Sequence, residues 1–339
     1  MDVPLWGWGL VLFVIVVMLA VDVLAHRDAH EIAPREALTW TTIWVISGLT
    51  FGLVIWWAAG SEFAEQYYAG FLIEKSLAVD NVFVWAIIFA SLGIPSKFQH
   101  RILFLGVLGA LIFRGALIAA GGALVKSFDW VLYIFAAVLI VTAIQMLRHR
   151  DDHSNPTEGR VYRWLTRVMP TTDVIYGQRF LVRAGATGAI VATPLFVALI
   201  LVELTDIVFA FDSIPAIFAV TSETFIVFTS NAFALLGLRA MYFLLADLMD
   251  RFVYLKLGLA AILGWVGVKL ALHSVVKIDT AVSLAVIIVI LAVSIGASLI
   301  KTRGQGRHHI EVEKPQHWDE ATPEQLASAR TVFTRKPLS

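Results

Sequence analysis

Long apolar runs, each about the length that crosses a bilayer, constrain this chain more than any other feature. The hydrocarbon core of a membrane is about 30 Å thick, so a spanning helix needs about 20 consecutive apolar residues. Nine such runs follow one another along the chain. They cover residues 5–24, 39–60, 66–91, 100–121, 128–147, 189–218, 224–247, 251–272 and 279–300. We therefore predict an all-α polytopic membrane protein with about nine transmembrane helices.

The composition supports the membrane class and excludes several functions. Of the 339 residues, 59% are hydrophobic and only 15% are charged, whereas a soluble domain is about half apolar and about a quarter charged. Basic and acidic residues are equal in number but segregated along the chain, so the zero net charge gives no reason to expect a nucleic-acid partner. Because the chain has no cysteine, it cannot form a thiolate metal site. Without a Walker A motif, ATP is not the expected energy source.

Positive charge marks alternate loops and so predicts the orientation. Loops rich in arginine and lysine contain Arg27, Lys97, the arginines of residues 148–188, Arg251 and Lys301. The intervening loops carry little beyond Lys126 and Lys277. The positive-inside rule then places the N-terminus outside and the C-terminus in the cytoplasm. The first apolar run lacks a basic leader, so we expect it to be retained as a span and not cleaved as a signal peptide.

The chain divides into a transmembrane transporter domain, residues 1–300, and a cytoplasmic C-terminal tail, residues 301–339. A cytoplasmic loop, residues 148–188, interrupts the domain. Within it, apolar and arginine residues recur at helical spacing from 160 to 168, which predicts a short amphipathic helix on the membrane surface or packed on the bundle. The tail holds a capping box that begins at Thr322, and three histidines without metal-ligand spacing, so we expect it to be solvated.

Two groups of three spans resemble each other in sequence. The segment VDNVFVW in the third run aligns with TDIVFAF in the sixth, which sets Asp80 over Asp206 at an offset of 126. The next spans align at nearly the same offset, with Arg114 over Arg239 at 125. A nearly constant offset over consecutive spans indicates an internal repeat.

The repeat predicts where a substrate would bind. The two copies cover residues about 66–147 and 189–272, and each has three spans, so they enter the membrane in opposite directions. Inverted repeats of this kind build secondary transporters, with the site near the midplane where the copies meet. A second register competes with the first, and it sets Glu74 and Asp80 over Asp206 and Asp212.

Five carboxylates lie inside these apolar runs, where they are costly. They are Glu74, Asp80, Glu203, Asp206 and Asp212. Each costs about 2.5–3.5 kcal/mol at a helix centre, so five unpaired charges would cost roughly 12–17 kcal/mol, which rivals the stability of a typical protein. Three buried bases supply supporting charge in ion pairs, namely Lys75, Arg114 and Arg239, but they leave a surplus of negative charge. The surplus predicts a bound cation, or protonation, and a proton-coupled carrier would use both.

Oxygen ligands at helical spacing favour a hard cation. Glu74 shares a helix face with Asn81, and Glu203 with Asp206. Carboxylate and amide oxygens suit Mn²⁺, Ca²⁺ or Mg²⁺, whereas all nine histidines fall in loops, tails or span ends, which disfavours Zn²⁺ and Cu²⁺. The predicted metal site consists of Glu74, Asp80, Asn81, Glu203, Asp206 and Asp212.

Prolines in the sixth run are expected to disturb its helix. Pro215 removes a backbone hydrogen bond, so the helix should kink or open near Asp212 and free carbonyl oxygens beside that carboxylate. Pro194 is expected to do likewise near the start.

At these residues the chain resembles a known family. The segments FLIEKSLAVDNVFVWAIIF, LVELTDIVFAFDSIPAIFAVT and SNAFALLGLRAMYFLLADL are similar to those of the TerC family of bacterial membrane proteins, in particular its Alx-type branch. The similarity extends from about Leu5 to the end of the ninth run and fades in the loop and the tail. It implies a multi-pass protein of the bacterial inner membrane, a role in metal-ion homeostasis, and above all manganese export. The family's acidic motif positions fall on the five carboxylates named above.

The leading interpretation is a secondary transporter that exports a hard divalent cation, most of all Mn²⁺, through a carboxylate-lined site between the repeats. Its expected partners are the cation, the lipid bilayer and protons, with no permanently bound cofactor. The alternative is an assembly or metal-delivery partner of other membrane machinery, or a protein of tellurite or other metal resistance. A membrane-embedded hydrolase is disfavoured because no protease-like glycine motif surrounds the acids, so no enzymatic activity is predicted.

Overall fold

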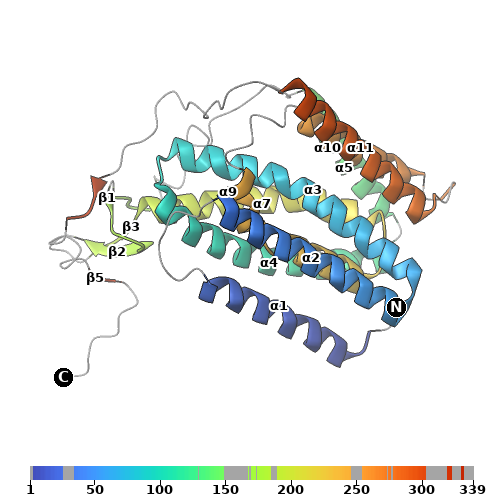
Figure 1. Cartoon of the computed structure of the whole chain (residues 1–339), viewed down its shortest axis with the longest axis horizontal. Coiled ribbons are helices and arrows are strands. Elements are labelled where there is room, and N and C mark those ends of the chain that lie inside the picture. Colours follow the sequence, from blue (N-terminus) through green and yellow to red (C-terminus); the bar gives the residue numbers. More distant parts are fainter. Residues whose placement is uncertain are drawn as a thin grey trace.

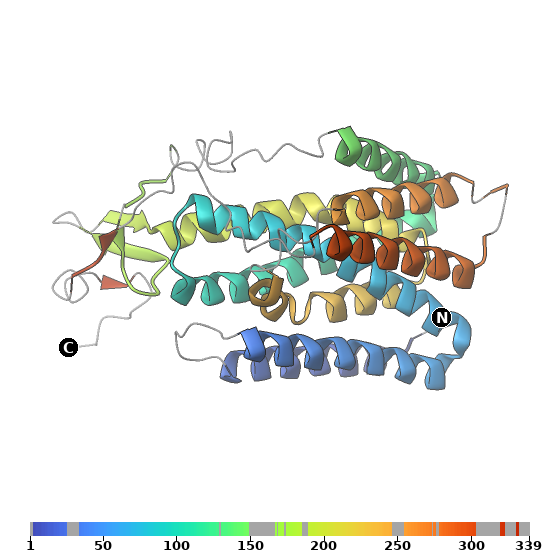
Figure 2. The same ribbon diagram turned by 45° about the horizontal axis from the view of Figure 1, so that its top comes forward.

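The computed structural model describes residues 3–25, 34–128, 130–148, 167, 169–172, 174–184, 189–245, 254–272, 274–275, 278–302, 319–322 and 330–331. Helices dominate it, and short strands gather at one end, at the left of Figures 1 and 2. The helices are α1 (Leu5–Ala25), α2 (Pro34–Ala59), α3 (Ser61–Ser91), α4 (Ser96–Ser127), α5 (Val131–Arg148), α7 (Pro194–Phe218), α8 (Thr224–Leu235), α9 (Leu238–Leu245), α10 (Leu255–Ala271) and α11 (Thr280–Lys301). The strands are β1 (Val174–Ile175), β2 (Leu181–Ala184), β3 (Ala189–Ala192), β4 (Asp319–Glu320) and β5 (Arg330–Thr331).

The predicted class, an all-α polytopic membrane protein, is confirmed. Among the described residues, six helices are long and apolar enough to span a membrane, or seven if the bent pair α8 and α9 forms one span. The charge-rich α3 and the short α10, of 17 residues, complete the predicted set of runs. Every predicted run therefore coincides with a helix or with the bent pair, while the count of nine spans remains a prediction.

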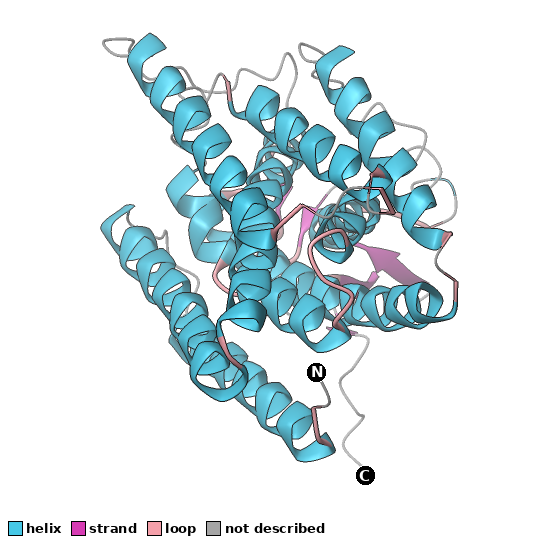
Figure 3. Cartoon of the chain, turned by 90° about the vertical axis from the view of Figure 1, so that its right-hand side faces the viewer, coloured by secondary structure: helices cyan, strands magenta, loops and turns pink. Residues whose placement is uncertain are grey.

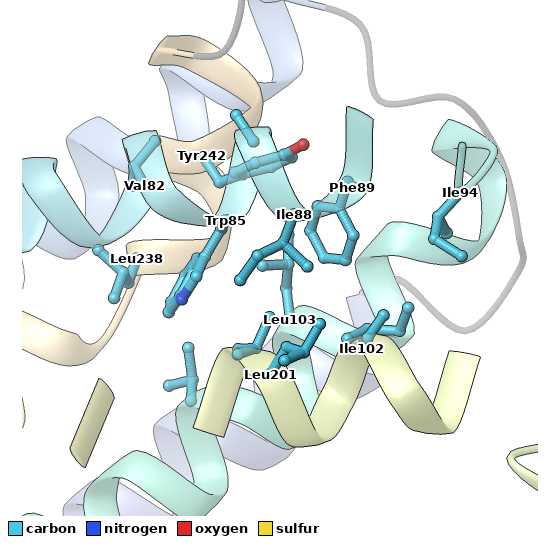
Figure 4. Close-up of a cluster of buried hydrophobic side chains, with 14 of the residues drawn as sticks. Val82, Trp85, Ile88, Phe89, Ile94, Ile102, Leu103, Leu201, Leu238 and Tyr242 are labelled. Carbon is cyan, nitrogen blue, oxygen red and sulfur yellow. The ribbon is translucent and has the colours of Figure 1, made fainter. Parts of the chain in front are cut away.

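The helices form one bundle, seen along its length in Figure 3. Its largest buried cluster joins α3 to α4 and α7, where Trp85 and Ile88 of α3 face Leu103 of α4 and Leu201 of α7 (Figure 4). The outer helices α1, α2 and α11 expose apolar side chains instead, such as Trp57, which is 89% exposed. Such a surface is expected of helices that face lipid, because the bilayer core has no water to solvate polar side chains, and the helix satisfies its own backbone polar groups.

The helix packing has the pairing that two related units would give. α3 packs on α8, α4 packs on α7, and α5 packs on α10. In the predicted repeat, α3 corresponds to α7, α4 to the bent pair of α8 and α9, and α5 to α10. Exchanging the two units then turns the α3–α8 contact into the α7–α4 contact and leaves the α5–α10 contact unchanged. This pairing agrees with the predicted repeat, which itself remains a prediction.

The predicted span 224–247 is not a continuous helix. α8 ends at Leu235, α9 begins at Leu238, and the two are bent by 44°. Gly237 sits in the break with φ +79, a conformation that favours glycine, and a Cβ there would collide with Trp44 of α2. The ammonium Nζ of Lys75 donates to the carbonyl oxygens of Ala234 at 2.9 Å and Leu236 at 3.4 Å, so α3 satisfies carbonyls that the break leaves free.

The loop and the tail meet in short strands. β2 pairs with β3 as an antiparallel hairpin, and β5 of the tail pairs antiparallel with β2. β1 of the loop pairs parallel with β4 of the tail. The described parts of loop and tail thus lie at the same end of the bundle, as the charge pattern predicts, and the tail strands β4 and β5 pair with loop strands.

The structure corrects the predictions about the start and the prolines of the sixth run. Residues 189–192 form β3, so the helix begins only at Pro194. Pro194 disturbs nothing, because the first helical residue needs no backbone donor. Pro215 lies within α7 without ending it, since the helix continues to Phe218, so the helix does not open near Asp212. The alternative expectation, a kink at Pro215, stays a prediction. Most of the predicted helix at 160–168, the tail histidines and the rest of the capping box beyond Thr322 lie outside the described residues.

Candidate cation site

Three helices bring two carboxylates and one guanidinium together in the interior. Glu74 of α3, Arg114 of α4 and Asp206 of α7 are at most 1% exposed. Arg114 holds Asp206 with two parallel hydrogen bonds, from Nε to Oδ2 at 3.1 Å and from Nη2 to Oδ1 at 2.8 Å. Its Nη1 donates to Glu74 Oε1 and, at 3.0 Å, to Ser213 Oγ. The single guanidinium of Arg114 therefore pairs with two buried carboxylates.

Two neutral side chains complete this cluster. The amide Nδ2 of Asn81 donates to Asp206 Oδ1 at 3.2 Å. The hydroxyl of Ser213 accepts from Arg114 Nη1, the same atom that donates to Glu74 Oε1, so Ser213 lies next to Glu74. We call Glu74, Asn81, Arg114, Asp206 and Ser213 the central cluster.

The contacts within the central cluster distinguish the two registers of the repeat. Glu74 and Asp206 are 132 residues apart, and so are Asn81 and Ser213. Exchanging the members of each pair turns the hydrogen-bonded pair Asn81–Asp206 into the pair Ser213–Glu74, whose members share the donor Arg114 Nη1. The geometry therefore favours the register that sets Glu74 over Asp206, not the one that sets Asp80 there.

Several oxygen atoms at this site are buried and have no hydrogen-bond donor. Among the described residues they include Glu74 Oε2 and Asn81 Oδ1 in the central cluster, and Asp80 Oδ1 and Glu203 Oε2 nearby in sequence. A buried acceptor without a donor costs about 1–3 kcal/mol, and more when it is charged. Oxygen atoms of this kind are the ligands that hard divalent cations prefer, so the donor set fits such an ion.

The remaining predicted acids lie around the central cluster and not in it. Glu203 is one turn from Asp206 on α7, and its carboxylate lies against Gly109 of α4. Asp212 accepts a 2.7 Å hydrogen bond from Thr142 Oγ1 of α5. Asp80 lies within electrostatic range of one base of α10, Lys256.

The predicted six-residue site is therefore divided. The structure brings Glu74, Asn81 and Asp206 together around Arg114, with Glu203 beside them, while Asp80 and Asp212 face the terminal helices of the opposite units. Within the described part of the chain, no three histidine, aspartate or glutamate side chains are close enough to hold a metal ion by themselves. A bound cation would need the amide and hydroxyl oxygens of Asn81 and Ser213, or a movement of Arg114.

The predicted supporting bases have different roles. Arg114 neutralises the buried acids as expected. Lys75 instead satisfies the carbonyls of the α8–α9 break. Arg239 donates to Asp22 Oδ1 of α1 at 2.6 Å, so it holds an outer helix, and a role of Arg239 at the site stays a prediction.

Sequence reasoning missed Gly109, Thr142 and Lys256. The segment GVLGALIFRGA contains the one signal available, because glycines at helical spacing indicate a close helix approach. Thr142 and Lys256 carry no signal of their own, since their roles depend on which helices pack together.

Comparison with known proteins agrees with these features. The model of the integral membrane protein TerC family matches residues 59–306, which include every residue of the site. This chain belongs to the TerC family. A Myxococcus xanthus protein described as "Uncharacterized membrane protein STKORF319" is 49% identical over 88% of this chain and 93% of its own length. An Escherichia coli K12 protein described as "Putative membrane-bound redox modulator Alx" is 45% identical over 85% of this chain and 92% of its own. No solved structure matches the chain.

Proposed function

We propose that this TerC-family protein is a secondary transporter that exports a hard divalent cation, most of all Mn²⁺, from the cytoplasm. The observation that carries the proposal is the pair of fully buried carboxylates, Glu74 and Asp206, with unsatisfied oxygens on Glu74 and Asn81 beside them. Intramembrane acids with open ligand positions mark ion pathways in membrane proteins.

The ligand chemistry supports Mn²⁺ over softer metals. The chain has no cysteine, and no histidine belongs to the central cluster. A site of carboxylate, amide and hydroxyl oxygens gives up the affinity by which Zn²⁺ and Cu²⁺ usually outcompete Mn²⁺. Ca²⁺ and Mg²⁺ are then the nearest competitors.

The helix arrangement supports transport. The central cluster lies where α3 and α4 of one predicted unit meet α7 of the other, as a site between inverted repeats should. The broken pair α8 and α9 packs beside it on α3, and discontinuous helices are a recurrent feature of secondary transporters.

A second proposal is that the protein assists other membrane machinery; its Escherichia coli relative is described as a putative redox modulator. The strands β1 to β5 favour it, because they form a structured surface outside the bundle on which a partner could dock. Since the chain has no cysteine, any thiol redox chemistry would have to come from that partner.

Cell manganese tests the transport proposal. In cells that lack other manganese exporters, the protein should lower total cell manganese during manganese excess, and Asp206→Asn should not. Glu62→Gln is the matched control, because Glu62 is an exposed acid in the first turn of α3. Membrane abundance and thermal stability of each variant should be compared, since substitution of a purely structural acid would lower abundance and stability together with activity. Equal activity from Asp206→Asn would contradict the proposal.

A further inference from the structure

We infer that Arg114 is a tethered competitor of the transported cation, and that Glu203 is the carboxylate that receives its guanidinium when a divalent cation enters the central cluster. The inference rests on the proposed function and adds a mechanism to it. It assigns a positioning role to Arg114 and an exchange role to Glu203.

The first step concerns occupancy. The guanidinium of Arg114 uses Nε, Nη1 and Nη2 to bind Asp206, Glu74 and Ser213, so it fills the space that a cation between those groups would take. If it withdraws, Glu74 Oε1, both oxygens of Asp206 and Ser213 Oγ lose its hydrogen bonds, while Glu74 Oε2 and Asn81 Oδ1 have no donor to lose. These six oxygens can then face an ion, and Asp206 Oδ1 keeps only the hydrogen bond from Asn81. A set of six oxygens suits Mn²⁺.

The second step concerns charge. Two ionised carboxylates with one guanidinium leave one negative charge, whereas two carboxylates with one divalent cation are neutral. Adding a divalent cation while the guanidinium stays would leave net positive charge in a fully buried place, which is costly. Guanidinium and divalent cation should therefore alternate in the cluster.

The third step concerns where the guanidinium goes. Glu203 is three residues before Asp206 on the same face of α7, so its carboxylate is the adjacent acceptor along that helix. It lies against Gly109, on the helix that carries Arg114, and its Oε2 is buried without a partner. A long, flexible arginine side chain can exchange one acid for the other, and an Arg114–Glu203 pair leaves both groups neutralised.

The exchange makes a specific prediction for binding. If the arrangement with Arg114 withdrawn is a minor state of about 0.1–10%, the observed affinity of the metal falls to that fraction of its intrinsic value. Arg114→Gln removes the competitor and should tighten Mn²⁺ binding about tenfold or more. Glu203→Gln removes the alternative acceptor and should weaken binding in the wild-type background, yet have no effect in the Arg114→Gln background.

Titration of the purified full-length protein with Mn²⁺, followed by the electron paramagnetic resonance signal of free Mn²⁺, measures these affinities. Flux should be measured on the same variants, because Arg114→Gln should bind Mn²⁺ more tightly but transport it more slowly. Loss of a merely structural arginine would instead lower both Mn²⁺ binding and Mn²⁺ flux. Weaker or unchanged binding by Arg114→Gln would overturn the inference. So would equal weakening by Glu203→Gln in both backgrounds, since Glu203 would then be a direct ligand.

Two further measurements keep the test decisive. If Arg114→Gln does not purify, Arg114→Lys keeps the charge but loses the paired hydrogen bonds, and should show a smaller gain in affinity, while a loss would contradict the inference. If neither the wild type nor any Arg114 variant binds Mn²⁺, the proposed function fails as well. If the wild type binds and transports Mn²⁺ but Arg114→Gln gains no affinity, only the exchange mechanism fails.

Discussion

Glu203 owes its position to a missing side chain on the neighbouring helix. Its carboxylate occupies the place that a Cβ on Gly109 would need, and Val202 Cγ1 would lie only 2.8 Å from a Cβ on Gly106. These two glycines let α4 and α7 approach closely. The approach also brings Arg114 of α4 within reach of Asp206 of α7.

Gly109→Ala should therefore damage both stability and transport. The added methyl group must displace the Glu203 carboxylate, and because this carboxylate ends a flexible side chain, the cost should lie at the lower end of the about 1–3 kcal/mol typical of overpacking. Gly264→Ala is the control, because the nearest side-chain atom to its Cβ, that of Ala143, is 3.8 Å away. Thermal unfolding in detergent and Mn²⁺ flux measure the two effects. A Gly109→Ala protein as stable and as active as Gly264→Ala would show that the close approach has no importance.

The break between α8 and α9 depends on a residue of another helix. Lys75 follows Glu74 directly on α3, so the side chain that closes the break and an acid of the central cluster belong to the same turn. A change in the cluster could therefore reach the bent pair through one turn of α3.

Lys75→Met tests whether Lys75 stabilises the break. It leaves the carbonyls of Ala234 and Leu236 without their donor in the interior, which should cost about 1–3 kcal/mol of stability. Lys126→Met serves as control, since Lys126 is exposed at the end of α4. Thermal unfolding compares them, and equal unfolding temperatures for the two variants would argue against a stabilising role of Lys75.

The sequence predicted the helices well because spanning length leaves a strong signal. It missed β3, since the four residues of AIVA are apolar and short, and periodicity cannot distinguish such a strand from a helix segment. It missed the α8–α9 break because a single glycine in an apolar run is often tolerated. The Arg239–Asp22 pair and the division of the acidic site depend on which helices meet, which no local pattern contains.

At the level of the entire protein, the loop and the tail are joined through strands that lead directly into α7. β5 of the tail pairs with β2, β2 pairs with β3, and β3 is followed after Thr193 by the helix that carries Glu203 and Asp206. The hydroxyl of Thr193, between β3 and α7, donates to the carbonyl of Arg179 at 2.8 Å and so links the start of α7 to the loop. β5 of the tail is therefore connected to α7 through two strand pairings.

Engineered cysteines test both the pairing and the orientation, because the chain has none of its own. Arg183 and Arg330 are directly paired across β2 and β5, so Arg183→Cys with Arg330→Cys should form a disulfide on mild oxidation, and neither variant alone should. A membrane-impermeant thiol reagent should label the single variants only after the cells are opened. Labelling in intact cells would reverse the predicted cytoplasmic placement.

Mn²⁺ flux into liposomes that contain only this protein tests the central claim most directly. A Mn²⁺-quenched dye trapped inside reports entry, and the wild type should give saturable quenching while Asp206→Asn, inserted in equal amount, gives the rate of empty liposomes. Wild-type liposomes that quench no faster than empty ones, or Asp206→Asn liposomes that match the wild type, would contradict a cation pathway through the central cluster.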